Sequence, residues 1–341
     1  MRSVTRTIGI VAVVLLAWAN AAPAQETKTP KAVLITGATT GIGRLTAEHL
    51  AKAGYFVYAG ARKQNDIDEL NEIENIKAVR LDVTIQSDID AAVELIEKEG
   101  RGLWGLVNNA GVNVVDPLIE ADFKDFQFIF DVNVFGVFRV SKAFAPLVIE
   151  SKGRIVNISS ISGVLAGGFD GYGMYVASKH ALEGLTDQMA WELGPLGVAV
   201  SSILPGGFAS DIGKSRCKRM LQNQAKKTYR YFGKSMESYI DSCKRRMSGE
   251  PMNIGPSPMP VALAIEQALF SESPREHYLV PGESDEARIT IAKLLEEIAG
   301  LNVDADHSLS DDELLEIYRN EARIAQGKQP RTMPGFYDEQ P

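Results

Sequence analysis

The chain has 341 residues, of which 45% are hydrophobic and 23% are charged, and its formal net charge is -8. This composition is ordinary for a globular protein with one large core. The acidic balance argues against a nucleic-acid partner. Two cysteines and four scattered histidines, which we interpret as structural or exposed, form no cluster at metal-ligand spacing.

The first 24 residues differ in character from the rest of the chain. Arg2 and Arg6 precede an apolar run from Ile8 to Ala19, and Ala22-Pro23-Ala24 offers a small-x-small cleavage site. This order predicts that residues 1–24 are a secretory signal peptide or, if uncleaved, an N-terminal membrane anchor. We therefore expect a protein that is exported (periplasmic or secreted) or associated with a membrane through its N-terminus. A buried helix is the alternative, disfavoured because the first predicted strand starts soon afterwards.

A strand, a glycine-rich turn and a helix follow one another next. The apolar stretch Ala32–Thr36 leads into Gly37, Gly41 and Gly43, and a helical pattern runs from Arg44 to Lys52. Such an arrangement points backbone N–H groups and a helix N-terminus at a nucleotide pyrophosphate. The spacing is G-x-x-x-G-x-G rather than the common G-x-G-x-x-G, so the loop is weak evidence alone and gains weight from the motifs below.

Strand-like apolar runs then alternate with amphipathic helical stretches such as Asp88–Glu99 and Asp122–Glu150. This rhythm predicts one α/β domain over residues 31–285, with a doubly wound, Rossmann-type parallel sheet and helices on both faces. A ligand would bind at the carboxyl ends of the strands. The predicted strands are Ala32–Thr36, Phe56–Gly60, Ala78–Asp82, Gly105–Asn108, Arg154–Ser159, Val198–Leu204 and His277–Val280, with a helix at Val261–Phe270 before the last.

Residues 211–250 interrupt this rhythm with a long, helical and locally basic stretch. We expect an insertion that covers the active site. Its apolar helical face either lines an apolar substrate or packs as core or as a dimer contact, and the sequence favours the two equally. Cys217 and Cys243 either form a disulfide, if the protein is exported, or remain free thiols. The face consists of Met236, Tyr239, Ile240, Cys243 and Met247.

The C-terminal residues read as an extension of the domain. Residues 286–325 are predicted to form a helical extension with two helices. Ser310 and Glu313 make a capping box before Leu314, which marks the start of the second helix. Residues 326–341 are predicted to be a flexible tail.

Tyr175 and Lys179 are the strongest candidates for catalysis. They stand four residues apart in a helical pattern, so both side chains lie on one face of a helix. A free phenol has a pKa of about 10, too high for a base at neutral pH. A neighbouring ammonium favours the phenolate, and Tyr175 can then exchange a proton with a substrate hydroxyl or carbonyl. Taken alone, Y-x-x-x-K also occurs by chance as a surface pair.

Three further motifs make chance a poor explanation. Asn108-Asn109-Ala110-Gly111 ends one predicted strand, Asn157-Ile158-Ser159-Ser160 ends another, and Asn133 falls in a helix between them that could back onto Lys179. With the glycine-rich loop before them and Tyr-x-x-x-Lys after them, these motifs are specific in combination. The chain resembles the short-chain dehydrogenase/reductase family over residues 31–280.

This resemblance implies a role for each motif residue. Tyr175 would be the catalytic acid/base, and Lys179 would lower its pKa and bind the nicotinamide ribose. Asn133 would hold a water in a proton relay, and Ser160 would orient the substrate. The cofactor would be held by Gly37, Thr39, Gly41, Ile42 and Gly43 at the pyrophosphate, by Asp82 and Val83 at the adenine, by Asn109, Ala110 and Gly111 on the adenosine side, and by Pro205 and Gly206 at the nicotinamide.

The position of the serine departs from the family pattern. Ser160 stands fifteen residues before Tyr175, whereas Ser162 stands at the usual thirteen. We favour Ser160 because it closes a predicted strand, and because Gly167 and Gly168 in the following loop can accommodate the additional length. Ser162 remains the alternative.

The end of the second predicted strand bears on the choice of cofactor. NAD-preferring sites usually offer an acidic side chain there to the ribose 2′-hydroxyl. This chain offers Ala61 and then Arg62, and a guanidinium can pair with a 2′-phosphate. We therefore expect NADP(H) to be favoured over NAD(H), with an exposed arginine at a strand end as the alternative.

Three segments resemble the retinol and hydroxysteroid dehydrogenase branch of the family: Gly102–Val107, the insertion with Tyr229 and Tyr231, and Pro274–Val280. The resemblance implies an NAD(P)(H)-dependent oxidoreductase that interconverts an apolar secondary or primary alcohol and its carbonyl compound, and the branch that it resembles acts on bulky apolar alcohols and ketones. We also expect a homo-oligomer. A non-catalytic dinucleotide-binding redox sensor is the alternative, opposed by the complete Asn-Ser-Tyr-Lys set. The glycine spacing opposes a sugar-nucleotide epimerase.

Overall fold

The computed structural model describes residues 30–168, 170–224, 227–250, 255–303 and 308–326. The predicted signal or anchor segment, residues 1–24, lies outside the described residues, as does the predicted tail beyond residue 326.

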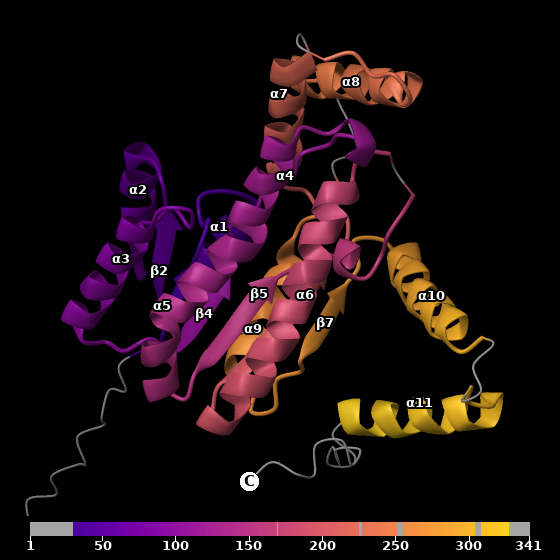
Figure 1. The fold of residues 1–341 in the computed structure, drawn as a ribbon. Helices are drawn as coiled ribbons and strands as arrows, with labels where there is room; N and C mark the ends of the chain where they lie inside the picture. The colour runs from indigo at the N-terminus through magenta and orange to yellow at the C-terminus, as the bar shows by residue number, and fades with distance from the viewer. Residues whose placement is uncertain (1–29, 169, 225–226, 251–254, 304–307, 327–341) are drawn as a thin grey trace, which may run out of the picture.

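The described residues form a seven-stranded parallel sheet in the order β3-β2-β1-β4-β5-β6-β7 (Figure 1). The order reverses between β1 and β4, which is where doubly wound sheets bind their ligands. The predicted fold class is confirmed. The strands are β1 (Ala32–Ile35), β2 (Phe56–Ala61), β3 (Ile76–Arg80), β4 (Gly105–Asn108), β5 (Arg154–Ile158), β6 (Ala199–Pro205) and β7 (His277–Val280).

The helices fall into four groups. One face of the sheet is covered by α1 (Gly41–Lys52), α2 (Gln64–Asn71) and α9 (Met259–Phe270), and the other by α3 (Gln86–Glu99), α5 (Gly136–Glu150) and α6 (Gly173–Leu193). Above the carboxyl ends of the strands stand α7 (Ile212–Gln224) and α8 (Gly233–Ser248), close to α4 (Phe123–Phe130) (Figure 1). On the β7 side lie α10 (Ser284–Leu301) and α11 (Asp311–Ala325).

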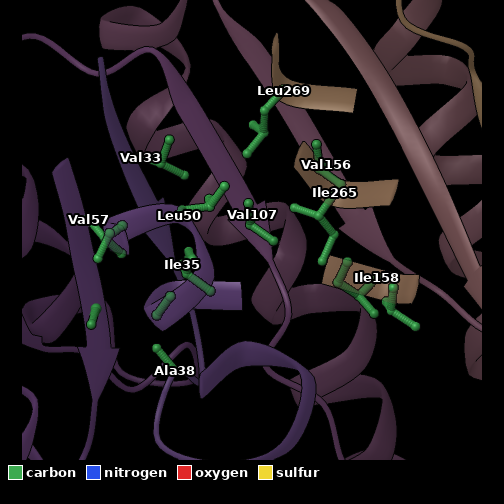
Figure 2. Close-up of a cluster of buried hydrophobic side chains, with 14 of the residues drawn as sticks. Val33, Ile35, Ala38, Leu50, Val57, Val107, Val156, Ile158, Ile265 and Leu269 are labelled. Carbon is green, nitrogen blue, oxygen red and sulfur yellow. The ribbon is translucent and has the colours of Figure 1, made fainter. Parts of the chain in front are cut away.

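The first strand shows how the sheet separates two cores. Val33 and Ile35 pack with Leu50 in the core under α1 and α9, where the labelled side chains in Figure 2 point toward one another. Ala32 and Leu34, which alternate with them, enter the core on the opposite face. A strand that is apolar on both faces is expected where helices cover both sides of a parallel sheet.

The predicted strand Ala78–Asp82 is displaced toward the N-terminus and ends at Arg80 as β3. The cause is a local turn at Asp82. Its Oδ1 accepts hydrogen bonds from the backbone N–H and the hydroxyl of Thr84, at 3.0 and 2.7 Å. Such a side-chain turn competes with the strand ladder and ends it.

The predicted helix Asp122–Glu150 is continuous in direction but contains a π-helical turn, η2 (Asp131–Phe135), between α4 and α5. The helix Phe123–Glu150 is long and apolar enough to cross a membrane by composition. However, Val140, Phe144 and Val148 are buried in the core with α3 and the sheet. This helix is therefore apolar because it packs against the sheet.

The predicted helical stretch over residues 211–250 consists of two helices, α7 and α8, within the described residues. Glu120 explains the break between α7 and α8. Its carboxylate accepts hydrogen bonds from the backbone N–H groups of Arg230 and Phe232, at 2.5 and 3.2 Å. A continuous helix would use these donors internally. The carboxylate is far away in the sequence, so helical periodicity alone gave no sign of the break.

Candidate active site

The glycine-rich turn between β1 and α1 is fastened to the end of β4. Gly37 and Gly41 have φ angles of +64° and +57°, which favour glycine. A Cβ on Gly37 would lie 2.9 Å from the Cα of Ala110. The Asn109 side-chain amide donates to the carbonyl oxygens of Thr36 and Gly37, at 2.9 and 3.0 Å. Asn109 thus holds the turn in place from the neighbouring strand.

This turn fits a dinucleotide pyrophosphate. The first turn of α1 contains no acidic residue, and the side chain of Thr40 forms no capping hydrogen bond. The first N–H groups of the helix and its dipole are therefore suited to an anion. Ile42 packs its side chain against the core, and Thr39 is half-buried in the turn. The part of this turn that would contact the pyrophosphate is therefore mainly backbone.

Tyr175 and Ser160 meet at the carboxyl edge of the sheet. Ser160 follows β5 and is 9% exposed, while Tyr175 lies in the first turn of α6, and the two side chains are hydrogen-bonded. Ser162 lies in a short 3₁₀ turn, η3 (Ile161–Gly163), and its backbone N–H donates to Ser160 Oγ at 3.1 Å. Among the described contacts, the serine that hydrogen-bonds with the Tyr175 hydroxyl is Ser160 and not Ser162.

Burial raises the pKa of the Tyr175 phenol, and its hydrogen bond with Ser160 only partly opposes this effect. Lys179 Nζ lies 5.7 Å from the centre of the Tyr175 ring and donates to the carbonyl of Ile158 at 2.8 Å. The predicted lowering of the phenol pKa by Lys179 is therefore wrong for the protein by itself. Desolvation of the phenol sets the direction of the shift, and the Lys179 ammonium is engaged with the Ile158 carbonyl.

Glu183 is a buried residue of this region that the sequence reasoning missed. Burial lowers the pKa of Lys179 to about 8, and the charge of Glu183, one helical turn later, opposes that shift. Glu183 Oε1 accepts from Ser202 Oγ at 2.6 Å, and its Oε2 lies 3.4 Å from His277 Nδ1. The spacing of four residues from Lys179 was the available signal.

The Glu183–His277 pair contributes to stability in a pH-dependent way. Its hydrogen bond to Glu183 raises the pKa of His277 above 6.5. Burial disfavours the Glu183 carboxylate, but hydrogen bonds, above all from His277, outweigh it and lower the pKa of Glu183 below 4.5. The carboxylate contribution is present above pH 4.5 and lost as pH falls through the lowered pKa. The imidazolium contribution is present below pH 6.5 and lost as pH rises through the raised pKa.

His277→Gln is therefore expected to lower the free energy of unfolding by about 0.5–1 kcal/mol near about pH 6. The loss should shrink near about pH 9, where the wild-type imidazole is neutral. Urea denaturation at both pH values measures the two differences. His180→Gln changes an exposed histidine of α6 and serves as the control. An equal loss at both pH values would contradict the charged pair.

Asn133 lies buried in the π-helical turn η2. Its Oδ1 accepts from the Val112 N–H at 2.8 Å, and its Nδ2 donates to the Val112 carbonyl and to Ser178 Oγ, both at 3.0 Å. Ser178 directly precedes Lys179, so the helix that carries Asn133 backs onto the catalytic segment of α6. A Cβ on Gly111 would lie 3.6 Å from Asn133 Oδ1. Single π turns are frequent at functional sites.

Arg62 and Asp82 pair across the carboxyl ends of β2 and β3. Arg62 Nη1 lies 3.6 Å from Asp82 Oδ2, and the Arg62 side chain is 69% exposed. Burial opposes ionisation of Asp82, but hydrogen bonds from Thr84 and the charge of Arg62 outweigh it and lower the pKa of Asp82. Val83 is buried with its side chain facing Gly136. The side chain of Val83 therefore belongs to the core.

The loop after β6, which begins at Pro205 and Gly206, is fastened to the C-terminal extension. Glu286 in the first turn of α10 accepts hydrogen bonds from the backbone N–H groups of Gly207 and Gly282, at 2.8 and 2.6 Å. The Gly206 N–H donates to the Val280 carbonyl at 2.8 Å. Sequence reasoning missed Glu286, which fixes the loop that the resemblance places at the nicotinamide.

A disulfide joins the two helices of the insertion, between Cys217 of α7 and Cys243 of α8, whose Cα atoms are 5.0 Å apart. The apolar face of α8 packs around this bridge, except for Met247, which is 46% exposed. Of the two interpretations of this face, core packing is therefore the one observed. The buried cluster consists of Val115, Cys217, Met220, Met236, Tyr239, Ile240 and Cys243.

Comparisons with known proteins show the family and the fold of the chain. The family model for short chain dehydrogenase matches residues 31–221. The chain is 33% identical to mitochondrial D-beta-hydroxybutyrate dehydrogenase of Bos taurus over 263 residues, which is 73% of this chain and 76% of the bovine protein. It is 33% identical to retinol dehydrogenase 7 of Rattus norvegicus, over 73% of this chain and 80% of the rat protein.

A solved structure of a short-chain dehydrogenase from Streptomyces avermitilis superimposes with a TM-score of 0.65 at 26% identity, over 85% of this chain and 98% of that one. The residues that the family model matches span the glycine-rich turn, the strand-end motifs and the Tyr-x-x-x-Lys helix of this chain. The chain therefore belongs to the short-chain dehydrogenase family, as an oxidoreductase of its retinol and hydroxysteroid dehydrogenase-like branch.

Proposed function

We propose that this protein interconverts an alcohol and its carbonyl compound with NADP(H), using Tyr175 as the proton-transfer group. The observation that carries the proposal is the hydrogen-bonded Tyr175–Ser160 pair with Lys179 behind it. Ser160 and the carbonyl that accepts from Lys179 stand at the carboxyl end of β5, and only β4 separates β5 from β1, whose turn fits a pyrophosphate. Reacting oxygen and cofactor would therefore meet at one edge of the sheet.

A bound nicotinamide would supply hydride transfer: two electrons and a hydrogen leave the alcohol carbon in oxidation or arrive at the carbonyl carbon in reduction. In reduction, Tyr175 donates its phenol proton to the carbonyl oxygen. Its raised pKa keeps the phenol protonated at neutral pH, as this step requires. In oxidation, Tyr175 accepts the hydroxyl proton. Ser160 orients the substrate oxygen, and Asn133 serves the predicted proton relay behind Lys179.

The test is a panel of steroids, retinoids, aliphatic ketones and hydroxy acids, each with NADP(H) and NAD(H). Turnover is followed through the absorbance of the reduced nicotinamide. We expect turnover of at least one class of substrate. A folded protein that binds the cofactor and turns over no member of the panel would favour the redox-sensor alternative.

The preference for NADP(H) rests on Arg62. The matched structures of similar fold include ElxO with NADP bound and 4-hydroxyisoleucine dehydrogenase with NADH, so the neighbours leave both cofactors open. Burial lowers the pKa of Arg219 in α7; the charge of Asp125 opposes this shift, and the charge of Arg62 adds to it. The exposed guanidinium of Arg62 at the end of β2 favours a 2′-phosphate over a bare hydroxyl.

Arg62→Ala is expected to weaken NADPH binding about 10- to 100-fold, the range for losing a hydrogen bond to a charged group. Its effect on NADH binding should be several times smaller, because NADH has no 2′-phosphate to lose. Fluorescence titration of the reduced cofactors measures both dissociation constants. Lys63→Ala changes the adjacent exposed cation and is the control. Equal losses for the two cofactors would refute the assignment.

The substrate predicted from the sequence is a small apolar alcohol or carbonyl compound. The rat relative, named as a retinol dehydrogenase, supports that class, while the bovine relative is named for D-beta-hydroxybutyrate, which carries a carboxylate. The apolar face of α8 gives the apolar class no support, since it packs within the insertion.

Two structural features support the remaining proposals. A disulfide such as Cys217–Cys243 persists mainly in oxidising compartments, which favours export. Exposed aromatic side chains favour a homo-oligomer, because Phe123, Phe135 and Phe138 are each more than half exposed. Phe123 and Phe135 also line a groove of about 810 Å³ along α4.

A further inference from the structure

A charged cavity of about 120 Å³ lies between α7 and the segment that follows β4. We call it the α7 cavity. Its lining includes three carboxylates and four cations: Asp116, Asp122, Asp125, Lys124, Arg216, Arg219 and Lys227. In Figure 1, α7 stands over the carboxyl edge of the sheet, above the start of α6. The cavity is therefore on the same side of the molecule as Tyr175.

Arg216 connects the α7 cavity to the catalytic tyrosine. Its Nη1 donates a hydrogen bond to the hydroxyl of Tyr172. The ring of Tyr172 lies edge-on to that of Tyr175, with the ring centres 6.5 Å apart. One aromatic ring thus separates the Arg216 guanidinium from Tyr175.

The charged groups of the cavity are unequally paired. Lys227 forms an ion pair with Asp116, and Lys124 forms one with Asp122 at 3.0 Å. Arg219 stacks over the ring of Phe128 at 4.2 Å. These contacts account for the other cations of the cavity.

Arg216 is different, because none of the described carboxylates forms an ion pair with it. It donates a hydrogen bond to the phenol of Tyr172 and lies over the rings of Tyr172 and Tyr239, at 5.2 and 5.7 Å from the ring centres. Its Nε is buried and has no hydrogen-bond partner among the described residues. Burial lowers the pKa of Arg216, and the charge of a second guanidinium, that of Arg246, also lowers it. Partial burial of a guanidinium without a counter-charge is unfavourable, and contacts with ring faces replace only part of what an anion supplies. The unpartnered Nε–H therefore favours an anion at this position.

We propose that Arg216 binds a carboxylate of the substrate, so that the physiological pair is a small hydroxy acid and its keto acid. The guanidinium has five N–H donors in a planar fork that matches a carboxylate, and its Nε–H is still available. This inference rests on the proposed function and narrows its substrate class. In the oxidation, the alcohol carbon loses hydride to NADP⁺ and the hydroxyl proton passes to Tyr175, while the carboxylate stays unchanged on Arg216.

The first measurement uses the wild-type protein and compares 3-hydroxybutyrate with 2-butanol, which has the same alcohol chain end and no carboxylate. We expect kcat/KM for the acid to exceed that for the alcohol by about 10- to 100-fold, the range for a charge-assisted hydrogen bond. Equal values for the two compounds, or a preference for 2-butanol, would overturn the inference whether or not any variant folds.

The second measurement compares Arg216→Gln with Lys218→Gln, which removes an exposed cation from the same helix. Arg216→Gln should raise KM for 3-hydroxybutyrate about 10- to 100-fold and leave the turnover of 2-butanol nearly unchanged. Lys218→Gln should change neither. A loss on both substrates in equal proportion would assign Arg216 to the fold and not to the carboxylate.

A binding measurement separates this inference from the proposed function. Millimolar acetoacetate should raise the melting temperature of the wild-type protein and not that of Arg216→Gln. Inorganic phosphate gives the comparison with an unrelated anion. If phosphate stabilises equally, the site takes anions in general and the substrate assignment is overturned. If the protein bound acetoacetate but turned over no substrate, the proposed function would be wrong and the carboxylate site would be supported. If it turned over uncharged alcohols alone, the proposed function would be supported and the carboxylate site would be wrong.

Discussion

Replacing Tyr175 with phenylalanine is expected to lower kcat/KM by about 10²- to 10⁴-fold in both directions, the usual contribution of a general acid or base. The variant removes only the hydroxyl, which is the group that hydrogen-bonds with Ser160. The ring stays in place against Tyr172 and near Lys179. The fold and the affinity for the cofactor should therefore change little, and the loss should appear in kcat.

Steady-state kinetics and a cofactor titration on the same samples measure the effect. Tyr231→Phe is a matched control, since that tyrosine is 65% exposed on the insertion. Turnover that survives in Tyr175→Phe at the wild-type rate, with the cofactor bound normally, would remove the proton donor on which the proposed function depends. A loss caused by misfolding would show as a fall in melting temperature, which Tyr231→Phe should not reproduce.

The sequence predicted the sheet well because its strands are buried on both faces. Such strands are short apolar runs, and they stand out from the amphipathic helices between them. The ends of Gly105–Asn108 and His277–Val280 agree with β4 and β7. Boundaries moved where a side chain made a local turn, as Asp82 does with Thr84.

The candidate site was predictable where each function is carried by residues adjacent in sequence. Tyr175 and Lys179 share one helix, and the spacing alone places them together. Glu286 and His277 act from other elements, and only the tertiary fold brings them to the β6 loop and to Glu183. Periodicity holds no information about such contacts. The same limit applies to Glu120, which ends a helical pattern more than a hundred residues away in the sequence.

The electrostatics could not be read from the sequence for a related reason. Spacing placed an ammonium near Tyr175, but the direction of the pKa shift depends on how deeply the phenol is buried and on where Lys179 donates its hydrogen bond. The burial of the Arg216 Nε could not be predicted from the sequence either. Eleven basic residues of the insertion look alike in the sequence, and only packing distinguishes Arg216, whose Nε is buried, from exposed ones such as Lys214 and Lys218.

Gly43→Ala is expected to weaken cofactor binding about 10- to 100-fold and to lower the free energy of unfolding by about 1–3 kcal/mol, as overpacking usually does. A Cβ at this position would overlap the Asn109 side-chain amide and lie 2.5 Å from the Gly37 carbonyl oxygen. Neither neighbour can move freely, because Asn109 donates to the carbonyls of Thr36 and Gly37. The alanine must therefore displace the turn that fits the pyrophosphate.

Gly184→Ala is the control that separates this steric effect from the change in stability that follows when any glycine within a helix is replaced. Gly184 lies within α6, and a Cβ there would have no atom within 4 Å. That variant should be more stable than the wild type by about 0.5–1 kcal/mol, the usual gain from replacing a mid-helix glycine. Thermal denaturation and titration of the reduced cofactor measure both variants. If Gly43→Ala bound the cofactor as tightly as Gly184→Ala, the close contact between the turn, Asn109 and α1 would not determine the shape of the dinucleotide site. The pyrophosphate site would then have to lie elsewhere at the carboxyl edge of the sheet.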